Sequence, residues 1–119
     1  MPSKAFEYVH YNGGLDTENG YPYAGVNQKC QYAKDEIGST VATIHNITFQ
    51  DESQLIKAIG TVGPVSIAYD VASDFKQYES GVYTSKLCSE SPMHVNHAVL
   101  AVGYDMHSST PYYIVKNSW

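Results

Sequence analysis

Two segments near the end of the chain, Val95–Tyr104 and Tyr112–Lys116, constrain its fold more than any other feature. Both are rich in valine, isoleucine and tyrosine, which favour β-strands, and a short polar stretch separates them. We expect them to be neighbouring antiparallel strands. The same composition predicts further strands at residues 41–49, 65–71 and 81–85.

Helical signals are concentrated earlier in the chain. Residues 2–11 carry an apolar stripe. Residues 50–59 are predicted as a second helix, in which Asp51 can act as N-cap with Gln54 three positions later. Residues 74–78 could form one more helical turn. Between the first two helices lies a long segment, residues 15–38, rich in glycine, asparagine and tyrosine, which we expect to be an ordered loop.

This layout predicts an α+β protein rather than one built from alternating strands and helices. We expect two parts. Residues 1–40 would be a helical segment with the long loop, and residues 41–119 would be a β-rich part.

Composition and charge argue against several classes of protein. With 119 residues, of which 43% are hydrophobic, the chain suits one globular domain or a piece of one. Its net charge is −5, and its seven basic residues are scattered lysines, so we expect no nucleic-acid partner. No apolar run approaches membrane-spanning length, so no membrane association is expected. The opening residues do not resemble a signal peptide, and any targeting signal would lie upstream.

The two terminal strands also hold the residues that could carry chemistry. His97 opens the first of them, and Asn117 directly follows the second. If the strands pair, the asparagine amide can orient the imidazole and fix its tautomer. A neutral amide suits a cysteine nucleophile, because the thiolate itself balances the charge of the imidazolium. Trp119 lies close enough in sequence to shield that hydrogen bond from water.

Simpler explanations exist for these residues. A histidine near a strand is more often structural than catalytic. His94, His97 and His107 could be proposed as metal ligands, but their spacing does not match a helical zinc motif, and we expect no metal and no cofactor. The acids Asp51, Glu52 and Asp105 lie where solvated side chains are common.

Several segments resemble papain-family cysteine proteases, in the same order and over essentially the whole chain. The stretch 95–104 resembles the family's histidine motif and 112–119 its asparagine motif; further matches are residues 2–8, 12–15, 21–23, 63–68, 75–78 and 81–83. The sequences around Asn46 and His94 are most similar to the cathepsin H and aleurain branch. The resemblance implies part of a papain-like fold: part of the helical domain followed by part of the antiparallel, β-barrel-like domain.

The resemblance also indicates which parts of the catalytic apparatus lie elsewhere. In this family the nucleophilic cysteine precedes the histidine by roughly 130–150 residues, which places it before Met1. The glutamine of the oxyanion hole would also lie upstream. Cys30 and Cys88 resemble structural cysteines that bridge to partners outside the chain, so we expect them not to be joined to each other.

From the family we therefore expect a cysteine peptidase, represented here by its C-terminal half, with peptide or protein substrates. A propeptide and cystatin-like inhibitors are further expected partners, and the location would be lysosomal, vacuolar or extracellular. The resemblance implies a pocket for the second residue before the scissile bond, lined by Met1, Pro2, Ala68, Val95 and Ala98. Asn46-Ile47-Thr48 is a candidate N-glycosylation site. The alternative is a non-catalytic module that binds peptides or an inhibitor.

Overall fold

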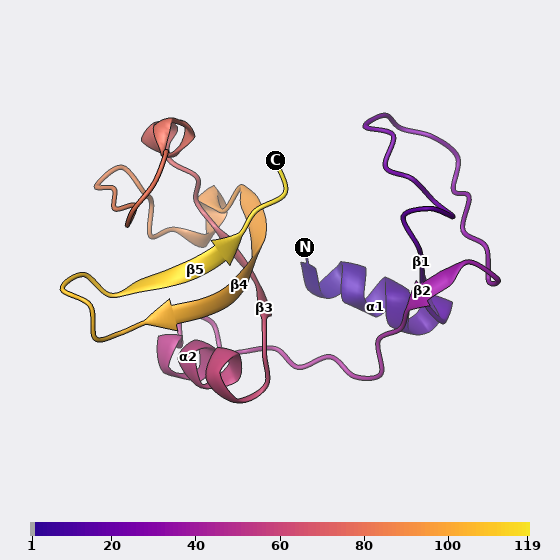
Figure 1. The fold of residues 1–119 in the computed structure, drawn as a ribbon, viewed down its shortest axis with the longest axis horizontal. Coiled ribbons are helices and arrows are strands. Elements are labelled where there is room, and N and C mark those ends of the chain that lie inside the picture. The colour runs from indigo at the N-terminus through magenta and orange to yellow at the C-terminus, as the bar shows by residue number, and fades with distance from the viewer. Residues whose placement is uncertain (1) are drawn as a thin grey trace. The chain divides into compact units, whose positions relative to one another are not determined.

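The computed structural model describes residues 2–119 and divides into two compact units. The first extends to Asn46, and the second is Ile47–Trp119 (Figure 1). The sequence had placed the division somewhat earlier, after residue 40.

The first unit contains one helix and one small sheet. Helix α1 (Pro2–Asn12) is followed by strands β1 (Leu15–Asp16) and β2 (Ile37–Ser39), which pair antiparallel and so close the long loop predicted between them. Side chains fix this loop. The Asp16 carboxylate accepts a hydrogen bond of 2.9 Å from the Ala33 amide, and the Tyr32 hydroxyl donates to the Asn12 carbonyl at 3.0 Å.

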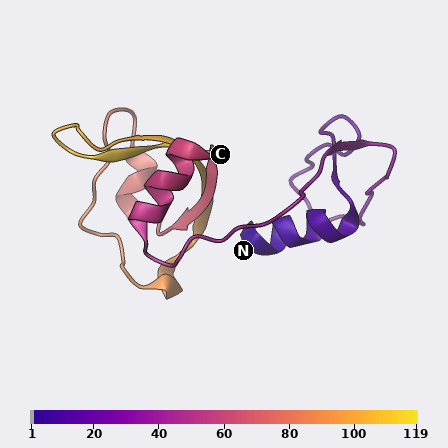
Figure 2. The same ribbon diagram turned by 90° about the horizontal axis from the view of Figure 1, so that it is seen from below.

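The second unit is a three-stranded antiparallel sheet with a helix packed against it (Figures 1 and 2). Its elements are α2 (Glu52–Thr61), β3 (Val65–Tyr69), β4 (His97–Asp105) and β5 (Tyr112–Lys116), with the strands in the order β3-β4-β5. Two 3₁₀ helices, η1 (Ser73–Gln77) and η2 (Pro92–His94), lie in the long connection between β3 and β4. The predicted pairing of the last two strands is confirmed.

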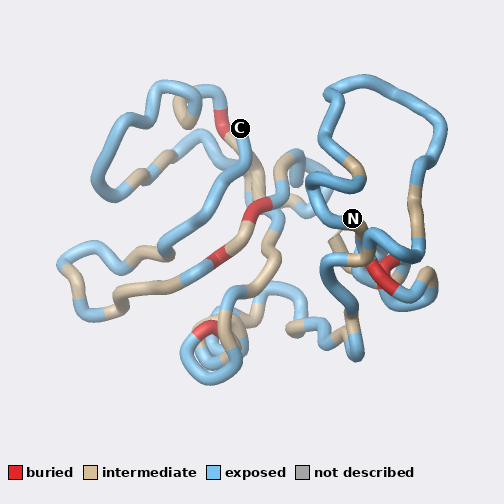
Figure 3. The backbone as a smooth tube through the Cα atoms, turned by 45° about the vertical axis from the view of Figure 1, so that its right-hand side comes forward, coloured by how far each residue is buried: buried red, intermediate tan, exposed pale blue. Residues whose placement is uncertain are grey.

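Helix α2 begins where the sequence indicates. The Asp51 carboxylate caps it by accepting a hydrogen bond from the Gln54 amide at 3.0 Å, and Gly63 follows its end with a positive φ of 138°. Its Ile59 is buried, as are Val99 and Ala101 of β4 (Figure 3). These three side chains form the small core on the helix-covered face of the sheet.

A bulge in β4 shifts the strand register. Ala101 pairs with Val115, but the next paired residue is Gly103, opposite Ile114. The extra residue reverses the side-chain alternation beyond it and turns Tyr104 towards α2. A methyl group on Gly60 would lie only 2.7 Å from the Tyr104 hydroxyl oxygen, so the two elements are in close contact there.

Two predicted strands are wrong. Residues 41–49 lie where the two units join and form no strand. Their composition favours a strand, but no neighbouring strand pairs with their backbone. Residues 81–85 are also irregular. There the side chains of Tyr83 and Ser85 bond to Asp74, and no neighbouring strand pairs with their backbone.

Among residues 2–119 no helix combines the length and the apolar character needed to cross a bilayer.

Candidate active site

His97 and Asn117 lie together at one end of the strands of the sheet in the second unit. His97 is the first residue of β4, and Asn117 directly follows β5, so antiparallel pairing places them at the same end of the sheet. The His97 Nε2 atom lies 2.9 Å from the Asn117 Oδ1 atom. The hydrogen bond expected from the sequence is therefore present.

The neighbouring backbone determines which protonation state of the histidine fits this geometry. The Ser118 backbone N–H donates to the same Asn117 atom at 2.8 Å, so that atom must be the amide oxygen. An amide oxygen only accepts, and Nε2 of His97 must then carry the proton. In the neutral ring the lone pair is on Nδ1, which forms no hydrogen bond within residues 2–119. A neutral His97 in this geometry therefore presents the lone pair of Nδ1.

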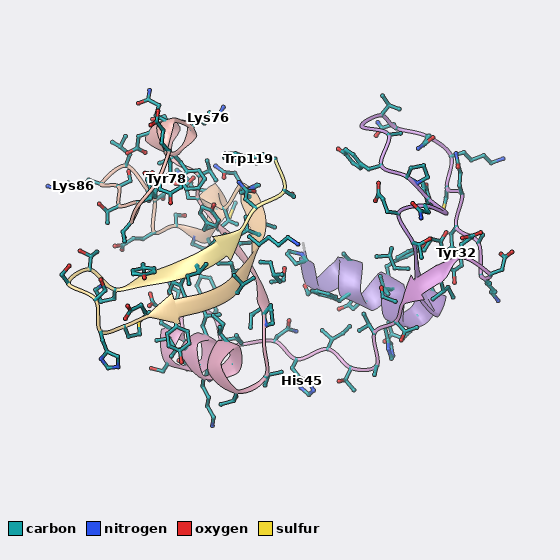
Figure 4. The ribbon with its side chains drawn as sticks, viewed as in Figure 1. Tyr32, His45, Lys76, Tyr78, Lys86 and Trp119 are labelled. Carbon is teal, nitrogen blue, oxygen red and sulfur yellow. The ribbon has the colours of Figure 1, made fainter. Side chains whose placement is uncertain are left out.

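Aromatic rings enclose the imidazole on two sides. Tyr69 pairs with His97 across β3 and β4, and the ring centroids are 5.8 Å apart in an edge-to-face arrangement. The Trp119 ring lies 5.0 Å from His97 on a tilted plane. Trp119, labelled near the end of β5 in Figure 4, is itself 71% exposed, so it covers the histidine while its own outer face meets solvent.

Neither cysteine is placed as a partner of the histidine. Cys30 and Cys88 are both exposed and, as expected from the sequence, are not joined to each other; Cys30 belongs to the first unit. The Cys88 Sγ atom lies 3.8 Å from the Asp70 carbonyl oxygen. Within the described residues no hydrogen bond joins His97 to a thiol, and no cluster of three or more His, Cys, Asp or Glu residues suits a metal ion.

The expected substrate-pocket residues are distributed over both units. Ala68 and Ala98 lie directly opposite each other on β3 and β4, and Val95 immediately precedes β4; all three are exposed. They do not contribute to the core. Pro2 begins α1 in the first unit, and Met1 lies outside the described residues.

The candidate glycosylation site is accessible. Asn46 is exposed in a segment without helix or strand. The Thr48 hydroxyl oxygen accepts a hydrogen bond of 3.0 Å from the Gln54 side chain.

Comparison with known proteins places this geometry in a family. The structure superposes on procathepsin L2 from the larval midgut of Tenebrio molitor with a TM-score of 0.90 and 36% sequence identity, covering 98% of this chain and 36% of that one. The sequence profile described as "Papain family cysteine protease" matches residues 1–119. The chain belongs to the papain family of cysteine proteases. The α+β class and the partial papain-like fold expected from the sequence are confirmed.

Relatives of the aleurain and cathepsin H type cover the whole chain. It is 55% identical to the oryzain gamma chain of Oryza sativa subsp. japonica, 50% to thiol protease aleurain of Arabidopsis thaliana and 46% to pro-cathepsin H of Mus musculus, each over 119 residues. The chain spans only about a third of the length of these relatives, from 33% to 36%. The branch suggested by the sequence motifs is thus confirmed.

Sequence reasoning missed two contributors to the site. One is Tyr69, whose position opposite His97 depends on strand register. The other is the Ser118 backbone amide, which fixes the Asn117 oxygen and has no side-chain signature. The aromatic residues between positions 69 and 83 were the available signal, but nothing in their spacing connects them to a histidine that is distant in sequence.

Proposed function

We propose that this chain is the base-bearing part of a papain-type cysteine peptidase, in which His97 is the general base and acid and Asn117 orients it. The observation that carries this proposal is the His97 Nε2 to Asn117 Oδ1 hydrogen bond of 2.9 Å, whose direction is fixed by the Ser118 amide. The nucleophilic cysteine and the oxyanion-hole glutamine are supplied by a part of the protein outside residues 1–119.

The chemistry follows from the free lone pair on His97 Nδ1. Nδ1 takes the proton of the cysteine thiol, and the thiolate attacks the carbonyl carbon of the scissile peptide bond. The imidazolium then gives that proton to the departing amine, leaving a thioester. Water, deprotonated by the same nitrogen, hydrolyses the thioester and restores the thiol. Throughout, Asn117 holds the ring by accepting from Nε2–H.

The same proposal extends to specificity. Ala68, Val95 and Ala98 of the second unit contribute to the pocket for the second residue before the scissile bond. These residues carry no charge, so an apolar substrate side chain is preferred there, and an arginine would enter poorly compensated.

The setting of the parent protein also belongs to this proposal. Cys30 and Cys88 each form a disulfide with a cysteine outside this segment, and Asn46 is glycosylated. The protein acts in a lysosome, a vacuole or the extracellular space, where disulfides persist and glycans are added. A propeptide and cystatin-like inhibitors are its expected regulators; the solved relatives described as procathepsins support the former.

A segment exchange tests the catalytic proposal. Residues 1–119 replace the aligned part of the rice oryzain gamma chain, with which they share 55% identity, and hydrolysis of a fluorogenic peptide is measured. We expect activity from this chimera, and a loss of about 1,000-fold or more in kcat for His97→Ala, because base and nucleophile act as a unit. The 119-residue chain alone should be inactive.

His94→Ala is the matched control, since His94 is an exposed histidine three positions earlier that has no part in the proposed chemistry. It should retain activity. A chimera that folds but binds peptides without cleaving them would favour the non-catalytic binding module instead. Activity that survives His97→Ala would overturn the assignment of the base.

A further inference from the structure

Four aromatic rings form a closed circuit of contacts: those of His97, Tyr69, Phe75 and Trp119. His97 neighbours Tyr69 and Trp119, and Phe75 neighbours the same two rings from the other side, with centroid distances of 5.9 Å to Tyr69 and 5.6 Å to Trp119. No ring pair joins Phe75 directly to His97. Phe75 therefore contacts both walls of the imidazole and not the imidazole itself.

The element that carries Phe75 is held firmly. It lies in η1 (Ser73–Gln77), directly after the buried Ala72. The adjacent Asp74 carboxylate accepts hydrogen bonds from the hydroxyls of Tyr83 at 2.6 Å and Ser85 at 3.1 Å. The Tyr83 hydrogen bond, with that of Ser85, lowers the pKa of Asp74, so the carboxylate stays charged and the anchor persists near neutral pH.

Tyr83, which donates to Asp74, also contacts one of the four rings of the circuit. Its ring meets Phe75 edge to face with centroids 4.8 Å apart, the shortest separation among the aromatic pairs of the described residues. The contacts therefore run from Asp74 through Tyr83 to Phe75, and from there to the two rings beside His97. Edge-to-face pairs of this kind each contribute on the order of 1 kcal/mol and prefer defined ring angles.

We propose that Phe75 is a positioning residue for the base: it keeps Tyr69 and Trp119 against His97 and so holds the imidazole in the orientation that Asn117 requires. This inference rests on the proposed function where it concerns catalysis, but its geometric part stands by itself. Trp119 is mostly exposed, and among the described residues its indole has two aromatic neighbours, Phe75 and His97.

The single tryptophan of the chain makes the arrangement measurable without any catalysis. A protonated imidazole in contact with an indole quenches its fluorescence, and a neutral one does so much less. In the 119-residue chain we expect Trp119 emission to be weaker in acid than in alkali, because a histidine side chain is charged in acid and neutral in alkali. His97→Ala should abolish this change, which identifies its source.

Phe75→Leu is the decisive variant, and Tyr78→Leu is its matched control. Tyr78 also stacks on Phe75, 6.1 Å away, but pairs with neither wall of the imidazole and is 46% exposed. We expect Phe75→Leu to lose most of the pH-dependent quenching and Tyr78→Leu to keep it. Phe75→Tyr, which retains the ring, should restore it. Phe75→Met, of similar volume but without a ring, provides a second ringless variant should the leucine variant show an altered far-UV CD spectrum.

The same variants in the oryzain chimera report on catalysis. Phe75→Leu should lower kcat by about 10- to 100-fold with a smaller change in KM, as expected for a misplaced base, while Tyr78→Leu leaves both constants near their original values. The proposal is overturned if the ringless variants quench as fully as the original chain, or if the original chain shows no quenching that depends on His97. An inactive chimera would count against the proposed function alone, because the fluorescence result decides the positioning role independently.

Discussion

Tyr69 and His97 lie directly opposite each other on β3 and β4, and their rings meet edge to face with centroids 5.8 Å apart. Cross-strand pairs of this type stabilise a sheet, and here the pair also places an aromatic ring beside the His97 imidazole. Burial, and then the nearby Cys88, raise the pKa of Tyr69, so its hydroxyl stays neutral near neutral pH. Tyr69 therefore contributes surface to the site and no competing charge.

Replacing the orienting amide should impair catalysis more than binding. In the chimera we expect Asn117→Ala to lower kcat by about 10- to 100-fold with little change in KM, because His97 loses the acceptor that fixes its tautomer. Steady-state kinetics with a fluorogenic peptide measures both constants. Ser118→Ala is the control, since Ser118 acts through its backbone amide, and it should retain kcat. An Asn117→Ala variant with unchanged kcat would show that the imidazole is oriented by other contacts.

The contact between β5 and α2 should make stability depend on alkaline pH. Burial, and then the neighbouring Glu52 carboxylate, raise the pKa of Tyr113 to about 12, while its hydroxyl donates to Glu52 at 3.2 Å. An unfolded tyrosine titrates near 10. The folded state therefore holds this proton more tightly. Its stabilising effect is complete below about pH 10 and is lost as pH rises towards about 12.

Tyr113→Phe should remove this part of the pH dependence. Urea unfolding of the second unit at successive alkaline pH values would show a shallower decline for the variant than for the original chain. Near neutral pH the variant should be less stable by about 1 kcal/mol, the usual net value of one hydrogen bond. Tyr112→Phe, on the preceding residue and the other face of the strand, is the control and should follow the original curve. Equal slopes for Tyr113→Phe and the original chain would contradict the assignment.

The two cysteines should both be available in the 119-residue chain. Because neither is joined to the other, titration of the denatured, non-reduced chain should find two thiols per molecule. Mass spectrometry under the same conditions would identify any covalent dimer. A monomeric mass with no reactive thiol would mean that Cys30 and Cys88 had paired, which would contradict this prediction.

The face of the sheet opposite α2 should promote self-association of the chain alone. It presents Ala68 and Ala98, both exposed, and Ile114, which is 51% exposed beside the bulge. Exposed apolar side chains on an uncovered face of a sheet favour association. We expect sedimentation velocity to show larger species as concentration rises, and Ile114→Lys to reduce them. Thr110→Lys, an added charge in the β4–β5 connection, controls for charge alone. A chain that stays monomeric at every concentration would count against this prediction.

The sequence by itself determined the residue types of the site and most of the local elements around them. His97 and Asn117 each adjoin a strand whose β-branched composition leaves few alternatives, and Asp51 with Gln54 marks the start of α2 through a purely local hydrogen bond. Such signals work because they depend on neighbours within a few positions in the chain. The predicted strands at 41–49 and 81–85 failed for the complementary reason: a strand needs a partner, and composition does not supply one.

Only the tertiary structure decided how these pieces act together. The register of β4 against β5 placed the Asn117 oxygen 2.9 Å from His97, and a shift of one residue would have moved that side chain to the other face. The bulge at Ala101–Gly103 turned Tyr104 towards α2, although no local signal marks it. The contacts of Tyr69 with His97 and of Phe75 with Trp119 join three segments that are distant in sequence. Their geometry depends on packing between surfaces, which a linear pattern does not encode.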